Sequence, residues 1–160
     1  EHLELTREAD GKIKAKATDK LPISEFPVSK KREDKTGCVV VWERPDKDPK
    51  FGMYYVSIDP VSEGKTTTSD SLCSMYVMKA PIEVTKVTAG ETETYLEQDK
   101  IVAAWCGRFD DINKTHERLS LVIEWYNAWA LIENNISLFI HQLLPQLHLK
   151  LVQKVKKKKF

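Results

Sequence analysis

Two carboxylates follow short apolar segments of the chain, where they could bind a divalent metal ion. Asp59 comes directly after the run 53–58, and Glu133 comes directly after the run 129–132. Mg²⁺ and Mn²⁺ prefer oxygen ligands, and Mg²⁺ usually takes several more from water and substrate phosphates. A third acid, Asp70, lies in the polar loop after Asp59 and could approach the same ions. We therefore predict a metal site built on Asp59, Glu133 and Asp70.

The chemistry expected of such a site is phosphodiester hydrolysis. Two ions about 3.5–4 Å apart can activate an attacking water and stabilise the leaving oxygen. Asp59 is expected to bridge the ions and Glu133 to hold one of them, so both acids are the predicted catalytic residues and Mg²⁺ or Mn²⁺ the cofactor. Each acid also has an ordinary structural interpretation. An Asp before Pro60 is typical of a turn, and Asp70 can start a turn or strand. Glu133 can belong to the N-cap region of a helix, where a negative charge is favourable.

Five apolar runs rich in β-branched or aromatic residues predict the strands that would position these acids. The expected strands are 38–42, 53–58, 71–78, 100–107 and 129–132. A polar connection is expected over 83–98.

Two helices are also expected. The first begins after an N-cap at Asp110 or Asp111 and ends near Asn127. Its apolar residues recur at three- and four-residue spacing, namely Leu119, Val122, Ile123 and Tyr126. The second covers 136–144 and is interrupted by Pro145.

The order of these elements predicts how the two acids meet. Loops of this size favour an antiparallel meander of the strands 53–58, 71–78 and 100–107 over crossover connections, and the helix before 129–132 implies a crossover to a parallel neighbour. If that neighbour is the strand 53–58, Asp59 and Glu133 lie at the carboxyl ends of adjacent parallel strands. Ligands of α/β sheets gather outside such ends. The predicted fold class is therefore α/β, with a mixed central sheet flanked by helices.

Composition limits the classes of function that remain. The formal net charge is +1, which argues against a protein that simply coats nucleic acid, although 30–32 and 154–159 are basic blocks. The three cysteines are far apart and form no C-x-x-C, so we expect free thiols in the core and no zinc site. No apolar stretch reaches the roughly 18 residues that a membrane span requires. Residues 1–36 are charged and poorly periodic, and we expect an extended leader or interdomain connection there.

Three sequence strings resemble the nuclease domain of the large terminase subunit of tailed phages. The string 54–60, with Gly64 and Asp70-Ser71 after it, looks like the opening motif of that domain. The string 101–110 resembles its third strand and the start of its first helix. The strings 124–127 and 130–135 look like the helix and the acidic strand end that carry its second metal ligand. The match covers roughly 37–144, and the order and spacing of the strings make it fairly specific.

The resemblance implies a ribonuclease H-like fold and cleavage of concatemeric double-stranded DNA during viral genome packaging. The partners that it implies are that DNA, the portal protein and the small terminase subunit, in the cytoplasm of the bacterial host and not in the mature virion. The family's third metal-binding Asp has no counterpart, because no Asp follows Asp111. We therefore expect 37–160 to be a nuclease domain that is incomplete at its C-terminal end. The chain also has no G-x-x-x-x-G-K-[ST] motif for a motor ATPase.

Two other functions are compatible with the same residues. A junction resolvase of ribonuclease H-like fold would use the same acids on a four-way junction or a transposon end. A non-catalytic docking module of the packaging motor would need no complete metal site, and the missing third acid favours this alternative.

Overall fold

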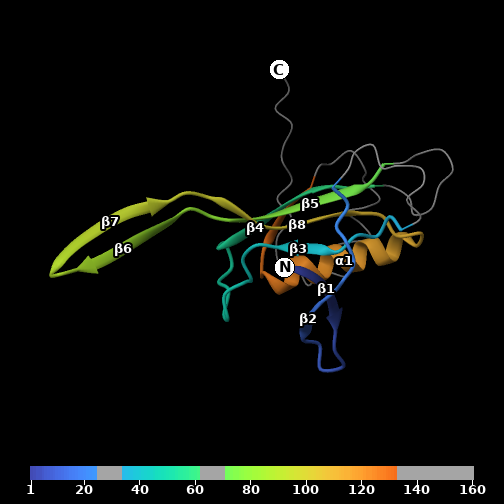
Figure 1. Ribbon diagram of the computed structural model, residues 1–160, viewed down its shortest axis with the longest axis horizontal. Coiled ribbons are helices and arrows are strands. Elements are labelled where there is room, and N and C mark those ends of the chain that lie inside the picture. The colour runs from blue at the N-terminus through green and yellow to red at the C-terminus, as the bar shows by residue number, and fades with distance from the viewer. Residues whose placement is uncertain (25–33, 62–70, 133–160) are drawn as a thin grey trace, which may run out of the picture.

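The computed structural model describes residues 1–24, 34–61 and 71–132. Nine strands and one helix are found in these ranges, coloured along the chain in Figure 1. The strands are β1 (His2–Arg7), β2 (Ile13–Ala17), β3 (Val39–Val41), β4 (Tyr54–Asp59), β5 (Cys73–Lys79), β6 (Ile82–Thr88), β7 (Glu91–Glu97), β8 (Lys100–Gly107) and β9 (Trp129–Ile132). The helix is α1 (Ile112–Trp125).

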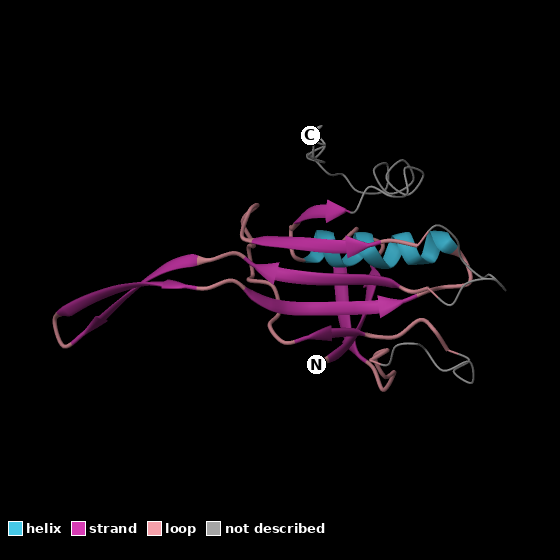
Figure 2. Ribbon diagram, turned by 90° about the horizontal axis from the view of Figure 1, so that it is seen from above, coloured by secondary structure: helices cyan, strands magenta, loops and turns pink. Residues whose placement is uncertain are grey.

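Seven of the strands form one mixed sheet in the order β2-β1-β3-β8-β5-β4-β9. All neighbours in it are antiparallel except β4 and β9, which are parallel. The helix lies along one face of this sheet, and β1 and β2 run steeply across the direction of the other strands (Figure 2). The remaining strands, β6 and β7, pair with each other and project from the body of the molecule.

The fold class predicted from the sequence is wrong. Strands hold 46% of the described residues and the helix 12%, so the protein is mostly β. A seven-stranded sheet with one described helix on one face is not a helix-flanked, ribonuclease H-like α/β fold. The meander of β4, β5 and β8 is as predicted, and so is the parallel pairing of β9 with β4. The expected second helix over 136–144 lies outside the described residues.

The error arises from segments that were interpreted as loops because they are polar. The strands β1 and β2 come from the segment expected to be a leader, and β1 joins the large sheet through β3. The strands β6 and β7 come from the expected polar connection. Every residue of β7 from Glu91 to Leu96 is exposed, so no burial pattern distinguishes that strand from a loop. Strand pairing requires only backbone groups, and alternating Glu and Thr residues do not prevent it.

The ends of α1 are capped by local hydrogen bonds. The side chain of Asp111 accepts a hydrogen bond of 2.9 Å from the Asn113 N–H, which confirms Asp111 as the N-cap. At the other end Asn127 adopts a left-handed φ of 47°, and Ala128 N–H donates to Ile123 O at 3.0 Å. This is the Schellman arrangement that satisfies the last carbonyls of a helix.

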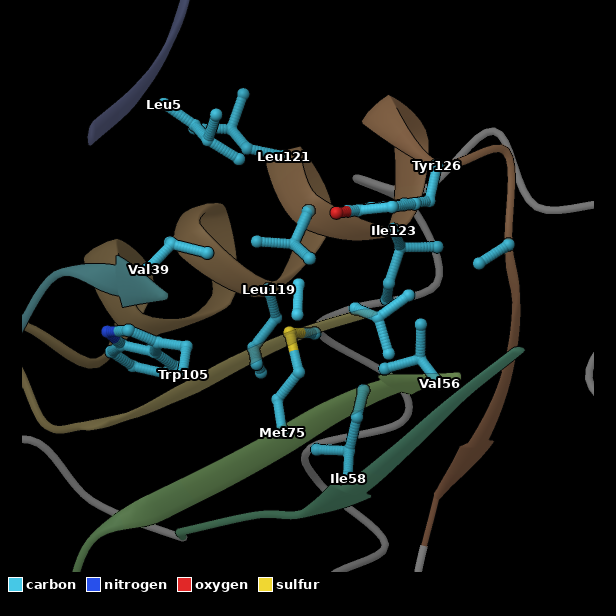
Figure 3. Close-up of a cluster of buried hydrophobic side chains, with 14 of the residues drawn as sticks. Leu5, Val39, Val56, Ile58, Met75, Trp105, Leu119, Leu121, Ile123 and Tyr126 are labelled. Carbon is cyan, nitrogen blue, oxygen red and sulfur yellow. The ribbon is translucent and has the colours of Figure 1, made fainter. Parts of the chain in front are cut away.

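The core lies between α1 and the facing side of the sheet (Figure 3). All four apolar residues predicted for the inner side of the helix are buried, and Leu119 contributes one of the largest of these side chains. The sheet contributes alternate residues, as its two-residue period requires, among them Val56 and Ile58 of β4 and Met75 of β5. The same alternation sends Asp59 to the opposite face. No helix in the described parts of the chain is long and apolar enough to cross a membrane.

Candidate functional site

Asp59 is the last residue of β4 and is exposed on the sheet face that α1 does not cover. Its register partner in β5 is Ser74, and Ser74 is in turn the partner of Cys106 in β8. Residues in register on neighbouring strands share one face of a sheet. Asp59, Ser74 and Cys106 therefore form a polar row across three strands. Asp59 is exposed to solvent and makes no ion pair with another residue of the described ranges.

The parallel pairing of β4 and β9 determines which ends of the strands meet. Ile58 and Ile132 are register partners. Asp59 directly follows the first residue of this pair in the sequence, and Glu133 directly follows the second. Glu133 and Asp70 both lie outside the described residues, so of the three predicted metal ligands the structure describes only Asp59.

Behind this polar row the sheet is buried and apolar. Cys73 precedes Ser74, points toward the core and is fully buried. Burial raises the pKa of its thiol to about 12, and the neighbouring Cys106 and Asp59 contribute in the same direction. The thiol of Cys73 is therefore neutral at physiological pH, as expected for a core cysteine. All three cysteines are free, as predicted; Cys38 and Cys73 are buried in the core, whereas Cys106 is half-buried on the open face and is not the core residue that was expected.

The end of β8 that adjoins this row is held by close backbone packing. A Cβ on Gly107 would lie 2.4 Å from Thr36 O, so only glycine fits there. The indole Nε1 of Trp105 donates to Thr36 O at 2.9 Å. Arg108, which follows β8, is almost buried and donates from Nη1 to Ser71 O at 2.9 Å. These bonds fix the segments before β3 and before β5 against the end of β8.

The apolar part of the same open face lies toward the other end of the strands. The ring of Tyr55 stacks on that of Trp129, with centroids 5.4 Å apart and planes inclined by 23°. The Tyr55 hydroxyl donates to Asp99 at 3.0 Å. Tyr76 and Leu131 are exposed beside them. The open face thus changes from apolar to polar as it approaches Asp59.

No group of three or more His, Cys, Asp or Glu side chains able to hold a metal occurs within 1–24, 34–61 and 71–132. The one acid among the described members of the polar row is Asp59. A surface hollow lined by Lys12, Asp48, Glu124 and Trp125 lies at the C-terminal end of α1. That hollow adjoins the start of β9, at the opposite end from Asp59, so it is not part of this row.

Sequence reasoning did not find Ser74, Cys106 or Arg108 as neighbours of the candidate site. Ser74 and Cys106 sit in runs that were interpreted only as strands, and their alignment with Asp59 depends on the register between β4, β5 and β8. Arg108 could have been singled out from the sequence, because a cation directly after a buried strand needs a partner.

In comparisons with known proteins, no family model matches this chain, and no curated protein or solved structure matches it. The chain presents a mostly β mixed sheet with a single described helix and an exposed carboxylate at the end of β4.

Proposed function

We propose that this chain is a metal-dependent endonuclease domain that hydrolyses phosphodiester bonds of double-stranded DNA. The observation that carries this proposal is the parallel register of Ile58 with Ile132, because a carboxylate follows each member of the pair in the sequence. Ligands of parallel strands bind outside the carboxyl ends of those strands, which is where these two acids would lie. The proposal does not depend on a ribonuclease H-like fold.

In the proposed site Asp59 and Glu133 hold Mg²⁺ or Mn²⁺, and Asp70 supplies a further oxygen ligand. The donor chemistry of Asp59 suits such an ion, since its carboxylate is exposed and free of ion pairs with described residues. Bound divalent ions would supply an activated water and neutralise charge on the phosphate. Asp59 is the one carboxylate among the described residues of the row, and the core below it is apolar.

The proposed biological setting is viral genome packaging. It rests on the resemblance of three sequence strings to the nuclease domain of the phage large terminase subunit. Concatemeric viral DNA would be the substrate, and the portal protein and the small terminase subunit would be partners. The proposed site of action is the cytoplasm of the infected bacterium.

Plasmid nicking tests the nuclease. Supercoiled plasmid is incubated with the chain and Mn²⁺, Mg²⁺ or EDTA, beside the variants Asp59→Asn and Glu133→Gln. We expect metal-dependent nicking that both variants lose by about 10²-fold or more, as is typical when a group stabilising the transition state is removed. Asp48→Asn is the matched control, because Asp48 is an exposed acid in the turn before β4, and it should retain wild-type nicking.

Metal binding is measured separately, by calorimetric titration of Mn²⁺ into each variant. Weaker Mn²⁺ binding by Asp59→Asn, with unchanged binding by Asp48→Asn, is expected. Wild-type nicking by Asp59→Asn would overturn the role of that residue. A preference for four-way junctions over linear duplex would identify the alternative substrate class, and an absence of nicking with every metal would favour the docking module.

A further inference from the structure

The strands β6 and β7 form a hairpin, called the arm here, that extends beyond the body of the protein (Figures 1 and 2). It spans Ile82 to Glu97, and within the described residues each of its strands pairs only with the other. The tight turn at its tip uses Ala89 and Gly90, both at positive φ. Each strand of the arm therefore leaves one edge of backbone N–H and C=O groups without a strand partner in the described structure.

The arm carries apolar side chains that the body does not cover. Val87 is 72% exposed and Leu96 59% exposed, and Tyr95 is 39% exposed. Two-stranded hairpins are marginally stable in water when nothing packs against them. Exposed strand edges that carry apolar side chains are templates for pairing with another chain.

The base of the arm, in contrast, is fixed to the sheet by ion pairs. Lys79 at the end of β5 lies 2.6 Å from Glu43, and Lys100 at the start of β8 lies 2.7 Å from the other oxygen of the same carboxylate. These hydrogen bonds, with Lys100 contributing most, hold the pKa of Glu43 below its usual range. The arm thus projects from a defined position of the sheet.

The register of the arm places its acidic side chains together. Successive side chains of a strand alternate between faces, so Glu91, Glu93, Tyr95 and Glu97 of β7 share one face. Lys86, the partner of Glu93 in β6, lies with its Nζ 5.2 Å from the centre of the Tyr95 ring. The ring of Tyr95 thus already contacts the ammonium of Lys86, and the three glutamates of this face outnumber its one lysine.

We propose that the outer edge of β7 is a docking site for an extended, lysine- or arginine-rich segment of a partner protein, which adds to the arm as a third strand. Backbone hydrogen bonds to the free edge would hold the segment, as in other cases of β-strand addition. Basic side chains at every second position of the segment would lie on the same face as Glu91 and Glu93. The next such position would lie opposite Tyr95, on the same face.

The charge of the arm argues against two other partners, a nucleic acid and a second copy of this chain. From Ile82 to Glu97 the arm has four glutamates and one lysine, so it repels a phosphate backbone. A second copy that paired through β7 would place glutamates beside glutamates, which is unfavourable across neighbouring strands. A basic polypeptide is the complementary partner.

The position of the arm separates it from the candidate metal site. The arm connects the end of β5 to the start of β8, whereas Asp59 lies level with the start of β5 and the end of β8. These are opposite ends of the same strands. A partner on the arm therefore leaves the row at Asp59 uncovered, and the proposal stands independently of the nuclease.

The test uses the whole chain and a fluorescein-labelled peptide in which lysine alternates with threonine or valine. Fluorescence anisotropy should show binding that weakens as salt is added, because exposed charge pairs are screened. The double variant Glu91→Gln with Glu93→Gln should weaken binding about fivefold, as expected from the loss of two cross-strand charge pairs. The matched control, Glu8→Gln with Glu117→Gln, neutralises two exposed acids outside the arm and should leave the affinity unchanged.

Hydrogen exchange then separates strand addition from simple charge attraction. The peptide should slow amide exchange in 91–97, and a peptide of the same composition with its lysines in one block should bind more weakly. Binding that is equally weakened in both double variants would overturn the proposal. So would an absence of binding at millimolar protein, or binding without added protection of 91–97.

Discussion

At the scale of single residues, Cys73 shows how burial controls chemistry near the candidate site. Its side chain is fully buried in the core, one position before the polar row. The pKa of the thiol is raised to about 12 chiefly because the thiolate would lose its hydration. The same position could hold a reactive thiol only if it were exposed or beside a cation.

We expect Cys73 to make the protein less stable at alkaline pH. In the unfolded chain the thiol ionises near pH 9, and in the folded protein only near pH 12, so unfolding releases a proton between these values. The contribution of the neutral thiol is complete below pH 9 and is lost as the pH rises. At about pH 11 the loss is about 2–3 kcal/mol, since each pKa unit corresponds to about 1.4 kcal/mol.

Urea unfolding at about pH 8 and about pH 11 measures this effect. The free energy of unfolding should fall less with pH in Cys73→Ala than in the wild type. Part of the fall should remain, because burial also raises the pKa values of Tyr54 and Tyr126. Equal pH dependence in the two proteins would show that Cys73 ionises normally in the folded state.

At the scale of elements, the arm depends on a turn that contains a strained residue. Ala89 has a φ of 52°, in the left-handed region where a Cβ is unfavourable. Two-residue hairpin turns with both residues at positive φ prefer Asn-Gly. The turn therefore joins β6 to β7 with an unfavourable backbone conformation at Ala89.

The substitution Ala89→Asn is expected to stabilise the arm by about 1 kcal/mol, because asparagine tolerates the left-handed region. Amide exchange within 82–97 should then slow by about fivefold, whereas exchange in the large sheet should not change. Ala89→Val is the opposite control, since a β-branched residue is disfavoured at positive φ, and it should speed exchange in the arm. If both variants exchanged alike, the turn would not limit the opening of the arm.

The elements that the sequence predicts well are those with a buried side. The strands 100–107 and 129–132 have the bounds of β8 and β9, because apolar runs there end at turn residues or polar residues. The strands β2 and β7 were missed because lysine or glutamate alternates with small polar or apolar residues and neither face is fully buried. The position of Asp59 at the end of β4 was predictable, because the apolar run of that strand stops there. Its alignment with Ser74 and Cys106 was not, because register between distant strands leaves no local pattern.

At the scale of the whole molecule, the N-terminal hairpin is part of the core. Leu3 and Leu5 of β1 are buried against the helix side of the sheet. Two ion pairs join the same hairpin to α1, one between Arg118 and Glu4 and one between Arg7 and Glu124, the latter 2.8 Å long. This segment therefore closes the core from one side.

Removal of residues 1–20 is expected to unfold the protein or leave it aggregated. Loss of two buried leucines alone costs about 3–6 kcal/mol, against a total stability of about 5–15 kcal/mol for a domain. Soluble yield and thermal unfolding measure the outcome. The milder variant Leu5→Ala should lower the free energy of unfolding by about 2–5 kcal/mol. An unchanged melting temperature after truncation would restore the original interpretation of 1–36 as a leader.

The place of β8 in the sheet has a consequence for how the chain folds during its synthesis. This strand pairs with β3 on one side and β5 on the other, so it alone connects β2-β1-β3 to β5-β4-β9. The strands β1 to β5 precede it in the chain, so until it leaves the ribosome β3 and β5 each have an unpaired inner edge. Pairings between such distant segments form slowly because the intervening loops must close first. The nascent chain is therefore open to misassembly at these two edges until Lys100–Gly107 emerges, and a chaperone that shields strand edges would act in that interval.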